Sequence, residues 1–118
     1  MRTSNPNLST ELLNGQGLGN QLWAYAATRS ISERLGFGFI LKGIDRFKGS
    51  DFLTLCEHDN IASEELELAF NTNYPAFHER QYFDPELNLF STYFDDQVLG
   101  ICGSHDLRGY FQSEAYFF

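Results

Sequence analysis

The chain has 118 residues, a length that suits one domain with its own hydrophobic core. Its 16 acidic and 8 basic residues give a formal net charge of −8, which argues against nucleic acid as a partner because phosphate binding needs a surplus of lysine and arginine. No run approaches the ~18 apolar residues of a membrane-spanning helix, and residues 1–9 lack the apolar core of a signal peptide. We therefore expect a cytoplasmic protein, with membrane association of a longer parent protein left open.

The first half of the chain predicts a parallel α/β sheet. Residues 1–10 are polar, and we expect a flexible tail there. A short strand at 11–14 leads into a glycine-rich turn, and the helical spacing of Ala24, Ala27, Ile31 and Leu35 predicts a helix over 21–35. Gly36 is expected to end that helix, before a buried apolar strand at 37–41. Strand, glycine turn, helix and strand in this order open a parallel sheet.

The second half gives weaker signals. Residues 116–118 are all aromatic, so we expect the domain to be incomplete at its C-terminal end. The expected elements, in chain order, are mainly loop over 42–62, a short helix at 63–70 capped by Ser63, a turn at 71–75, strands at 79–83 and 106–110, a strand or helix end at 98–102, and the start of a helix at 112–118.

The glycine turn is the strongest local motif. Gly17 and Gly19 remove side chains where the backbone bends or another group approaches, and the following helix start is a potential anion site. Asn20 replaces the third glycine of the dinucleotide fingerprint, and Gln21 stands where a P-loop has lysine, so a dehydrogenase and a nucleotide hydrolase are both disfavoured. A purely structural alternative remains, in which Asn20 caps the helix and the glycines only make the turn.

Two segments resemble one enzyme family. Residues 15–26 read Gly-Gln-Gly-Leu-Gly-Asn-Gln-Leu-Trp-Ala-Tyr-Ala, and residues 107–117 read Leu-Arg-Gly-Tyr-Phe-Gln-Ser-Glu-Ala-Tyr-Phe. Both resemble motifs of the α-1,2-fucosyltransferases, glycosyltransferase family 11, with Ala115 in place of the usual lysine. The Tyr-Phe-Asp-Pro run at 82–85 is a fainter third match.

This resemblance implies the Rossmann-like N-terminal half of a GT-B-type enzyme, with residues 11–118 forming a partial domain. Such an enzyme transfers fucose from GDP-fucose to a galactoside hydroxyl with inversion, and it needs no metal or other cofactor. By resemblance, Gly17, Leu18, Gly19 and Asn20 bind the donor, and Gln112 and Ser113 are weaker candidates for the same role. The partners implied are a sugar nucleotide and a galactoside acceptor.

The departures from the family pattern bear on activity. The family motif His-x-Arg-Arg-x-Asp supplies an arginine to the donor phosphates, and none of His58, His78 and His105 begins such a motif. The donor-binding half is also missing from the sequence. We therefore assign no catalytic residue and expect this chain alone to be inactive.

Other polar and aromatic residues have plainer interpretations. His105 and Asp106 are neighbours on an expected strand, so they point to opposite faces. The pair Asp95 and Asp96 is interpreted as a solvated turn, and no metal site is expected. The rings at 110–118 are mostly expected in the core, while Gln112 and Ser113 either cap the last helix or face the cleft.

Two competing functions stay open at this point. The first is a non-catalytic carbohydrate- or nucleotide-binding α/β module, and the second is a structural α/β domain whose glycine turn binds nothing. Cys56 and Cys102 lie far apart in sequence, and we expect two free thiols.

Overall fold

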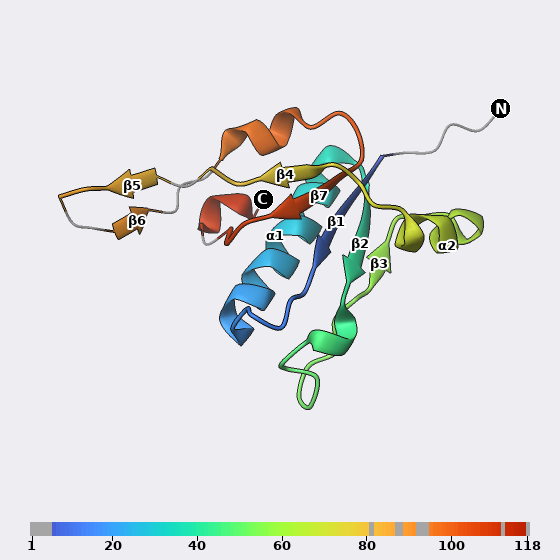
Figure 1. Cartoon of the computed structure of the whole chain (residues 1–118). Coiled ribbons are helices and arrows are strands. Elements are labelled where there is room, and N and C mark those ends of the chain that lie inside the picture. Colours follow the sequence, from blue (N-terminus) through green and yellow to red (C-terminus); the bar gives the residue numbers. More distant parts are fainter. Residues whose placement is uncertain (1–5, 81, 87–88, 92–94, 112, 118) are drawn as a thin grey trace.

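The computed structural model describes residues 6–80, 82–86, 89–91, 95–111 and 113–117, and it confirms the predicted α/β class (Figure 1). In chain order the elements are β1 (Asn7–Glu11), α1 (Leu18–Leu35), β2 (Gly38–Lys42), η1 (Ile44–Arg46), β3 (His58–Asp59), α2 (Ser63–Asn71), β4 (Ala76–His78), β5 (Tyr82–Asp84), β6 (Leu89–Ser91), η2 (Asp96–Gly100), β7 (His105–Arg108) and η3 (Glu114–Tyr116).

One mixed sheet organises these elements. It has five strands in the order β3-β2-β1-β7-β4. The pairs β1–β2, β1–β7 and β4–β7 are parallel, and only the edge strand β3 runs antiparallel to β2. The chain leaves β1 toward β2 and β3 on one side, crosses to β4 at the far edge, and then places β7 between β4 and β1. A separate antiparallel pair, β5 and β6, extends away from the sheet (Figure 1).

The central strand lies where we predicted a flexible tail. Residues 7–10 belong to β1, which is flanked on both sides, so the tail assigned to residues 1–10 is wrong for that part, while residues 1–5 lie outside the described residues. The hydroxyls that make this segment look like a loop are buried and bonded: Ser9 donates to Asp106 Oδ1 at 2.8 Å, and Thr10 donates to the Leu107 carbonyl at 3.1 Å. Internal hydrogen bonds therefore let a polar sequence occupy the centre of the sheet.

Helix α1 follows the predicted period and stop. The expected stripe residues Ala24, Ala27 and Ile31 are buried, whereas Leu35 is only partly buried. Gly36 adopts the left-handed conformation with φ of 73° and ends the helix, as predicted. The helix begins at Leu18, earlier than the predicted residue 21, and Gly17 is its N-cap.

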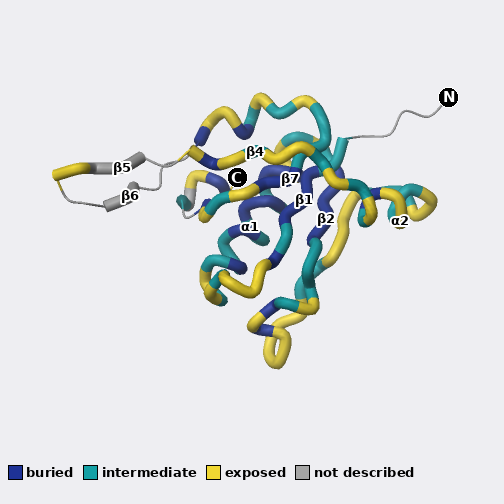
Figure 2. Tube along the Cα trace, in the orientation of Figure 1, coloured by how far each residue is buried: buried dark blue, intermediate teal, exposed yellow. Residues whose placement is uncertain are grey.

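The apolar core packs between α1 and one face of the sheet (Figure 2). One cluster joins α1 and β1 to the C-terminal elements, and its buried members are Leu8, Ala27, Ile31, Val98, Leu107, Phe111 and Tyr116. A second cluster lies at the glycine-turn end of the helix, with Leu12, Phe39, Leu41 and Phe47 as its buried members. The aromatic residues Phe111 and Tyr116 are thus core, as predicted, whereas Tyr110 and Phe117 are exposed and depart from the prediction.

Several weaker predictions need correction. The strand expected over 79–83 begins after β4 has ended at His78 and overlaps only β5, with Glu79 and Arg80 in neither strand and residue 81 outside the described residues. The apolar run at 98–102 falls mostly in the short helix η2. The helix expected at 63–70 is confirmed as α2, but its N-cap is Ala62, and Ser63 is its first residue. The final helix is a single turn, η3. Short elements with one or two apolar side chains carry too little periodicity to be assigned from sequence.

Candidate functional site

The glycine turn joins the carboxyl end of β1 to the start of α1. Gly17 is the N-cap residue with extended backbone, and no side chain caps this helix end. Asn20 is a residue of the first helical turn, so the alternative in which Asn20 caps the helix is wrong. Leu18 turns its side chain into the core cluster around Phe47, which gives it a structural role. The helix start therefore presents backbone N–H groups rather than a capping side chain.

The glycines of this turn are not required by packing. A Cβ placed at Gly15, Gly17 or Gly19 would meet no heavy atom of the described chain within 4 Å. None of the three has a positive φ, unlike Gly36 and Gly43. Because neither crowding nor backbone conformation explains them, the missing side chains leave open space at the helix start that another molecule can approach.

Gln21 fixes this turn, a role that the sequence analysis did not assign to it. Its side chain is fully buried and bonds through both ends. Nε2 donates to the carbonyls of Leu13 at 3.2 Å and Arg46 at 2.9 Å, while Oε1 accepts from the Lys48 N–H at 3.0 Å. One amide thus ties the glycine turn to the segment that follows β2. Its spacing indicates this burial in the sequence, because Gln21 lies one helical turn before Ala24 and so falls on the buried stripe of the helix.

A small cavity lies beside the turn, at the carboxyl ends of β1 and β7. Its volume is about 90 Å³, and it is lined by Thr10, Glu11, Leu13, Gln16, Asp106, Leu107, Arg108 and Gly109. These two strands are parallel neighbours. In open α/β sheets ligands bind outside the carboxyl ends of the strands.

The carboxylates of this cavity are engaged by arginines. Arg46 Nη2 lies 2.6 Å from Glu11 Oε2 and donates to it. Arg108 Nε donates to Asp106 Oδ2 at 2.9 Å, and the other oxygen of Asp106 accepts from Ser9. Both acidic groups are therefore neutralised locally, so the negative charge of the whole chain is not concentrated at this crevice.

No family model, curated protein or solved structure gives a significant match to this chain. Among the described residues, no helix is both long enough and apolar enough to cross a membrane. Within the same residues, no group of three or more His, Cys, Asp or Glu side chains is arranged to hold a metal ion.

The two segments that resemble the fucosyltransferase motifs meet in space. The ring of Trp23, from the first segment, stacks on that of Phe117, from the second, with centroids 5.5 Å apart and an interplanar angle of 24°. Gly19 and Leu22 complete a shallow groove of about 250 Å³ with these rings. The contact places residue 117 close to the glycine turn, although the segments are separated by most of the chain.

Gln112 and Ser113, the weaker donor-binding candidates, stay predictions in that role. Gln112 lies outside the described residues. Ser113 caps η3, because its Oγ accepts from the Ala115 N–H at 3.3 Å and its carbonyl accepts from the Tyr116 N–H at 3.2 Å. Of the two roles left open for Ser113, the structure shows the cap.

A buried polar network holds the second segment, and the sequence did not reveal it. Glu79 accepts hydrogen bonds from the N–H groups of Tyr110 and Phe111 through Oε1 and from the Tyr116 hydroxyl through Oε2. Gly109 passes so close that a Cβ there would lie 2.5 Å from the Glu79 Cβ. Burial, together with the hydrogen bond to Glu79, raises the pKa of Tyr116 well above its ordinary value.

Asp95 completes the network, and its burial contradicts the solvated turn that we predicted there. Its carboxylate is buried and accepts from the side chain and backbone N–H of Arg80, while its own N–H donates to the Tyr116 hydroxyl at 2.9 Å. Burial raises the pKa of Asp95, but the hydrogen bonds from Arg80 outweigh it, and the net shift is downward. Only Asp96 is exposed, so the predicted solvated turn is wrong for Asp95.

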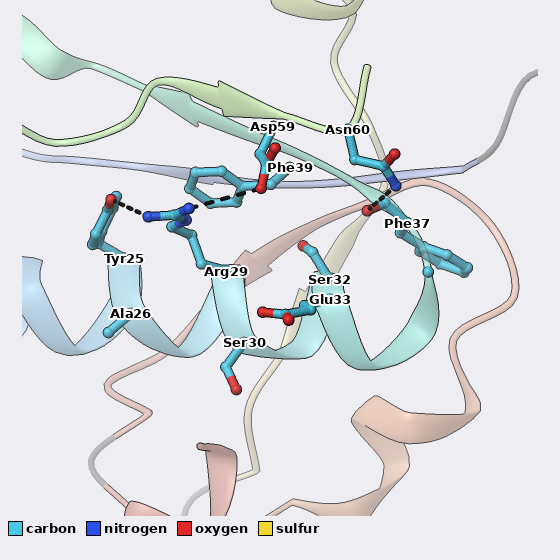
Figure 3. A pocket seen from close by; sticks show the side chains of 11 residues that line it. Tyr25, Ala26, Arg29, Ser30, Ser32, Glu33, Phe37, Phe39, Asp59 and Asn60 are labelled. Carbon is cyan, nitrogen blue, oxygen red and sulfur yellow. Dashed lines mark hydrogen bonds and ion pairs between the residues drawn. The ribbon is translucent and has the colours of Figure 1, made fainter. Parts of the chain in front are cut away.

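A larger cavity of about 650 Å³ lies beside the later turns of α1, against the edge formed by β2 and β3 (Figure 3). Arg29 extends into it between Tyr25 and Asp59, donating to the Tyr25 hydroxyl at 3.0 Å and lying 3.7 Å from Asp59 Oδ2. The Tyr25 hydroxyl bond, the largest cause, raises the pKa of Arg29, so this guanidinium stays charged. The cavity is lined by mixed polar and aromatic groups with the arginine already engaged, and most of its residues fall outside the two matched segments.

Proposed function

We propose that this chain is the Rossmann-like N-terminal part of a GT-B-type galactoside α-1,2-fucosyltransferase, and that its glycine turn contacts the diphosphate of GDP-fucose. The observation that carries this proposal is the glycine turn itself. It stands at the carboxyl end of the central strand, beside a cavity at the carboxyl ends of β1 and β7, and its three Cβ positions face open space. The contact between the two motif-like segments supports the same interpretation.

The chemistry of the proposed reaction explains why such a turn is useful. Transfer of fucose with inversion develops negative charge on the leaving diphosphate, and donors already aimed at that charge lower the barrier. Backbone N–H groups at the start of α1 and the Asn20 amide supply neutral donors, and the positive end of the helix dipole adds to them. The proposal includes no metal, and it assigns no catalytic acid or base to this chain.

The test is a titration of the ¹⁵N-labelled chain with GDP-fucose, observed through its amide resonances. We expect the largest shifts at Leu18, Gly19 and Asn20, with guanosine as a control that carries no phosphate. Affinity for half of a site is weak, with a Kd on the order of 1 mM. The proposal fails if no amide of the turn responds, or if the response is confined to the cavity around Arg29.

A non-catalytic carbohydrate-binding module is the second candidate, favoured by the groove between Trp23 and Phe117. Trp23 is the only tryptophan of the chain, so its fluorescence reports directly on that groove. A fluorescence response to lactose without any amide response to GDP-fucose would favour the module over the transferase. A response to neither ligand would favour a structural domain.

A further inference from the structure

Arg108 stands out among the side chains that line the cavity at the carboxyl ends of β1 and β7. It comes at the carboxyl end of β7, and its side chain is 57% exposed. Its Nε donates to Asp106 Oδ2 at 2.9 Å, while its two terminal nitrogens make no hydrogen bond or ion pair with the described part of the chain. The cavity is therefore lined by a guanidinium whose two terminal NH2 groups are available to a ligand.

The carboxylate of Asp106 sets the orientation of this guanidinium. Asp106 is buried with 7% exposure, and its other oxygen accepts from the Ser9 hydroxyl at 2.8 Å. A carboxylate held in this way fixes the direction of the Nε bond, and a guanidinium is planar, so the terminal fork is fixed with it. Such a pre-oriented fork matches the paired oxygens of a phosphate or carboxylate.

The neighbouring charges do not compete for this fork. Glu11, the other carboxylate at the cavity, is held by Arg46, whose Nε also donates to the Leu12 carbonyl at 2.7 Å. Arg80 is committed as well, with Nε and Nη2 both on Asp95. Among these guanidiniums only that of Arg108 keeps both terminal groups open while lining a cavity in the described chain.

We propose that Arg108 binds one phosphoryl group in this cavity, so that the glycine turn and Arg108 hold it from opposite walls. Leu13 and Gln16 line the wall on the turn side, and Arg108 and Gly109 line the wall on the β7 side. The volume of about 90 Å³ is far below the ~300–1,000 Å³ of a pocket for a whole small molecule, and it suits a tetrahedral oxyanion. The identification of that oxyanion as part of the GDP-fucose diphosphate rests on the proposed function.

The charge of the chain makes a local cation necessary. With a net charge of −8 the protein repels a diphosphate at long range, and neutral N–H donors alone offset little of that repulsion. A bidentate guanidinium supplies both charge and direction, whereas a lysine supplies a point charge only. The identity of residue 108 as arginine is therefore part of the proposal.

The test uses inorganic pyrophosphate as the probe and the amide resonances of the full 118-residue chain as the readout. Wild type is expected to show saturable shifts at Gln16, Leu18 and Gly109. Arg108→Gln is expected to weaken binding by about tenfold, and Arg108→Lys by about threefold, because lysine keeps the charge but loses the fork. Thermal unfolding of each variant shows that the fold is intact.

The matched control is Arg34→Gln, which removes the same charge in the last turn of α1, about 24 Å along the helix from Leu18. Equal losses in the Arg108 and Arg34 variants, or absence of pyrophosphate binding to wild type, overturn the proposal. If GDP-fucose binds at the turn and Arg108→Gln leaves its affinity unchanged, Arg108 has no such role while the proposed function stands. If pyrophosphate binds through Arg108 but GDP-fucose binds no better, the phosphoryl site stands and the transferase does not.

Discussion

Buried carboxylates determine much of the polar structure at the residue scale. Glu79, Asp95 and Asp106 are all at least nine-tenths buried, and each accepts hydrogen bonds from side-chain or backbone donors. A buried charge without partners destabilises a fold strongly, whereas a paired one is tolerated and gives a specific geometry. In this chain the pairs hold the two segments that border the candidate site: Asp106 orients Arg108, and Glu79 fixes the turn after β7.

The lowered pKa of Asp95 predicts an acid-dependent contribution to stability. Because its folded-state pKa lies below the ordinary value of 3.8, the contribution is complete above the unfolded-state pKa and is lost as the pH falls through the folded-state pKa. We expect Asp95→Asn to lower the free energy of unfolding by about 1–3 kcal/mol at neutral pH. The difference between wild type and variant should shrink toward acid in urea unfolding at a series of pH values.

The neighbouring residue provides the control for this measurement. Asp96 has a side chain that is 79% exposed and lies 3.4 Å from the same arginine, Arg80. Asp96→Asn should change stability by no more than about 0.5 kcal/mol at any pH. A gap between wild type and Asp95→Asn that is constant with pH would show that the carboxylate charge is not the cause.

The sequence could not distinguish these two aspartates, because their local contexts are the same and their environments are set by distant residues. Asp95 is buried by contacts with Arg80 and Tyr116, which lie 15 and 21 positions away along the chain. The burial of Ser9 and Thr10 is hidden from the sequence for the same reason, since the partners of their hydroxyls come from β7. Polar residues can be predicted as buried only when their partners are known.

At the scale of elements, α1 and its glycines offer a test that separates stability from binding. Gly19 lies in the first turn of the helix, where a methyl group meets no heavy atom of the described chain and φ is not positive. Gly19→Ala should therefore raise the free energy of unfolding by about 0.4–1 kcal/mol, chiefly by restricting the unfolded chain. If the open space receives a diphosphate, the same methyl group should weaken GDP-fucose binding by about tenfold, or ~1.4 kcal/mol.

Gly36 is the control at the other end of the same helix. A methyl group at this position would also meet no heavy atom of the described chain within 4 Å, but the φ of 73° disfavours any other residue. Gly36→Ala should lower stability by about 1–2 kcal/mol and leave ligand binding unchanged. If Gly19→Ala destabilises the chain as much as Gly36→Ala, the glycine turn has a structural requirement and the functional interpretation of its open space fails.

The elements that sequence predicted well are those with several consistent local signals. Helix α1 combines a long apolar period with a glycine stop, and β2 is a compact apolar run, so both were placed within a few residues. The elements β4, η2 and η3 have three to five residues each and depend on tertiary contacts for their form. Of the candidate site, the glycine turn was predictable, whereas the cavity required knowledge that β7 lies beside β1.

At the scale of the whole molecule, the two faces of the sheet differ. One face is covered by α1 and the apolar core, while α2 contacts β2 on the other, where Ile40 is buried and Lys42 donates to the Thr72 carbonyl at 2.7 Å. Over β1 and β7 that second face carries polar side chains, among them Ser9 and Asp106. Parallel sheets are usually apolar on both faces. The hydrogen-bonded polar face explains why the sequence of β1 is not typical of a buried strand.

At the same scale, we predict that the chain alone does not transfer fucose. Transfer needs a group that takes the proton of the acceptor hydroxyl and a full set of charges around the diphosphate. The carboxylates at the cavity, Glu11 and Asp106, are both engaged by arginines, and none of the three histidines is among the described residues that line it. Neither these carboxylates nor the histidines therefore provide a base near the glycine turn.

We therefore expect no product above background when the purified chain is incubated with GDP-fucose and lactose and the mixture is analysed by mass spectrometry. A preparation from host cells that lack the gene, taken through the same purification, sets the background. Phosphoryl binding at Arg108 is compatible with this result, because holding the diphosphate does not by itself activate the acceptor. Turnover that stays with the chain through repurification would mean that a base exists among its residues, and Glu11 and Asp106, as carboxylates that line the cavity beside the turn, would be the first to replace.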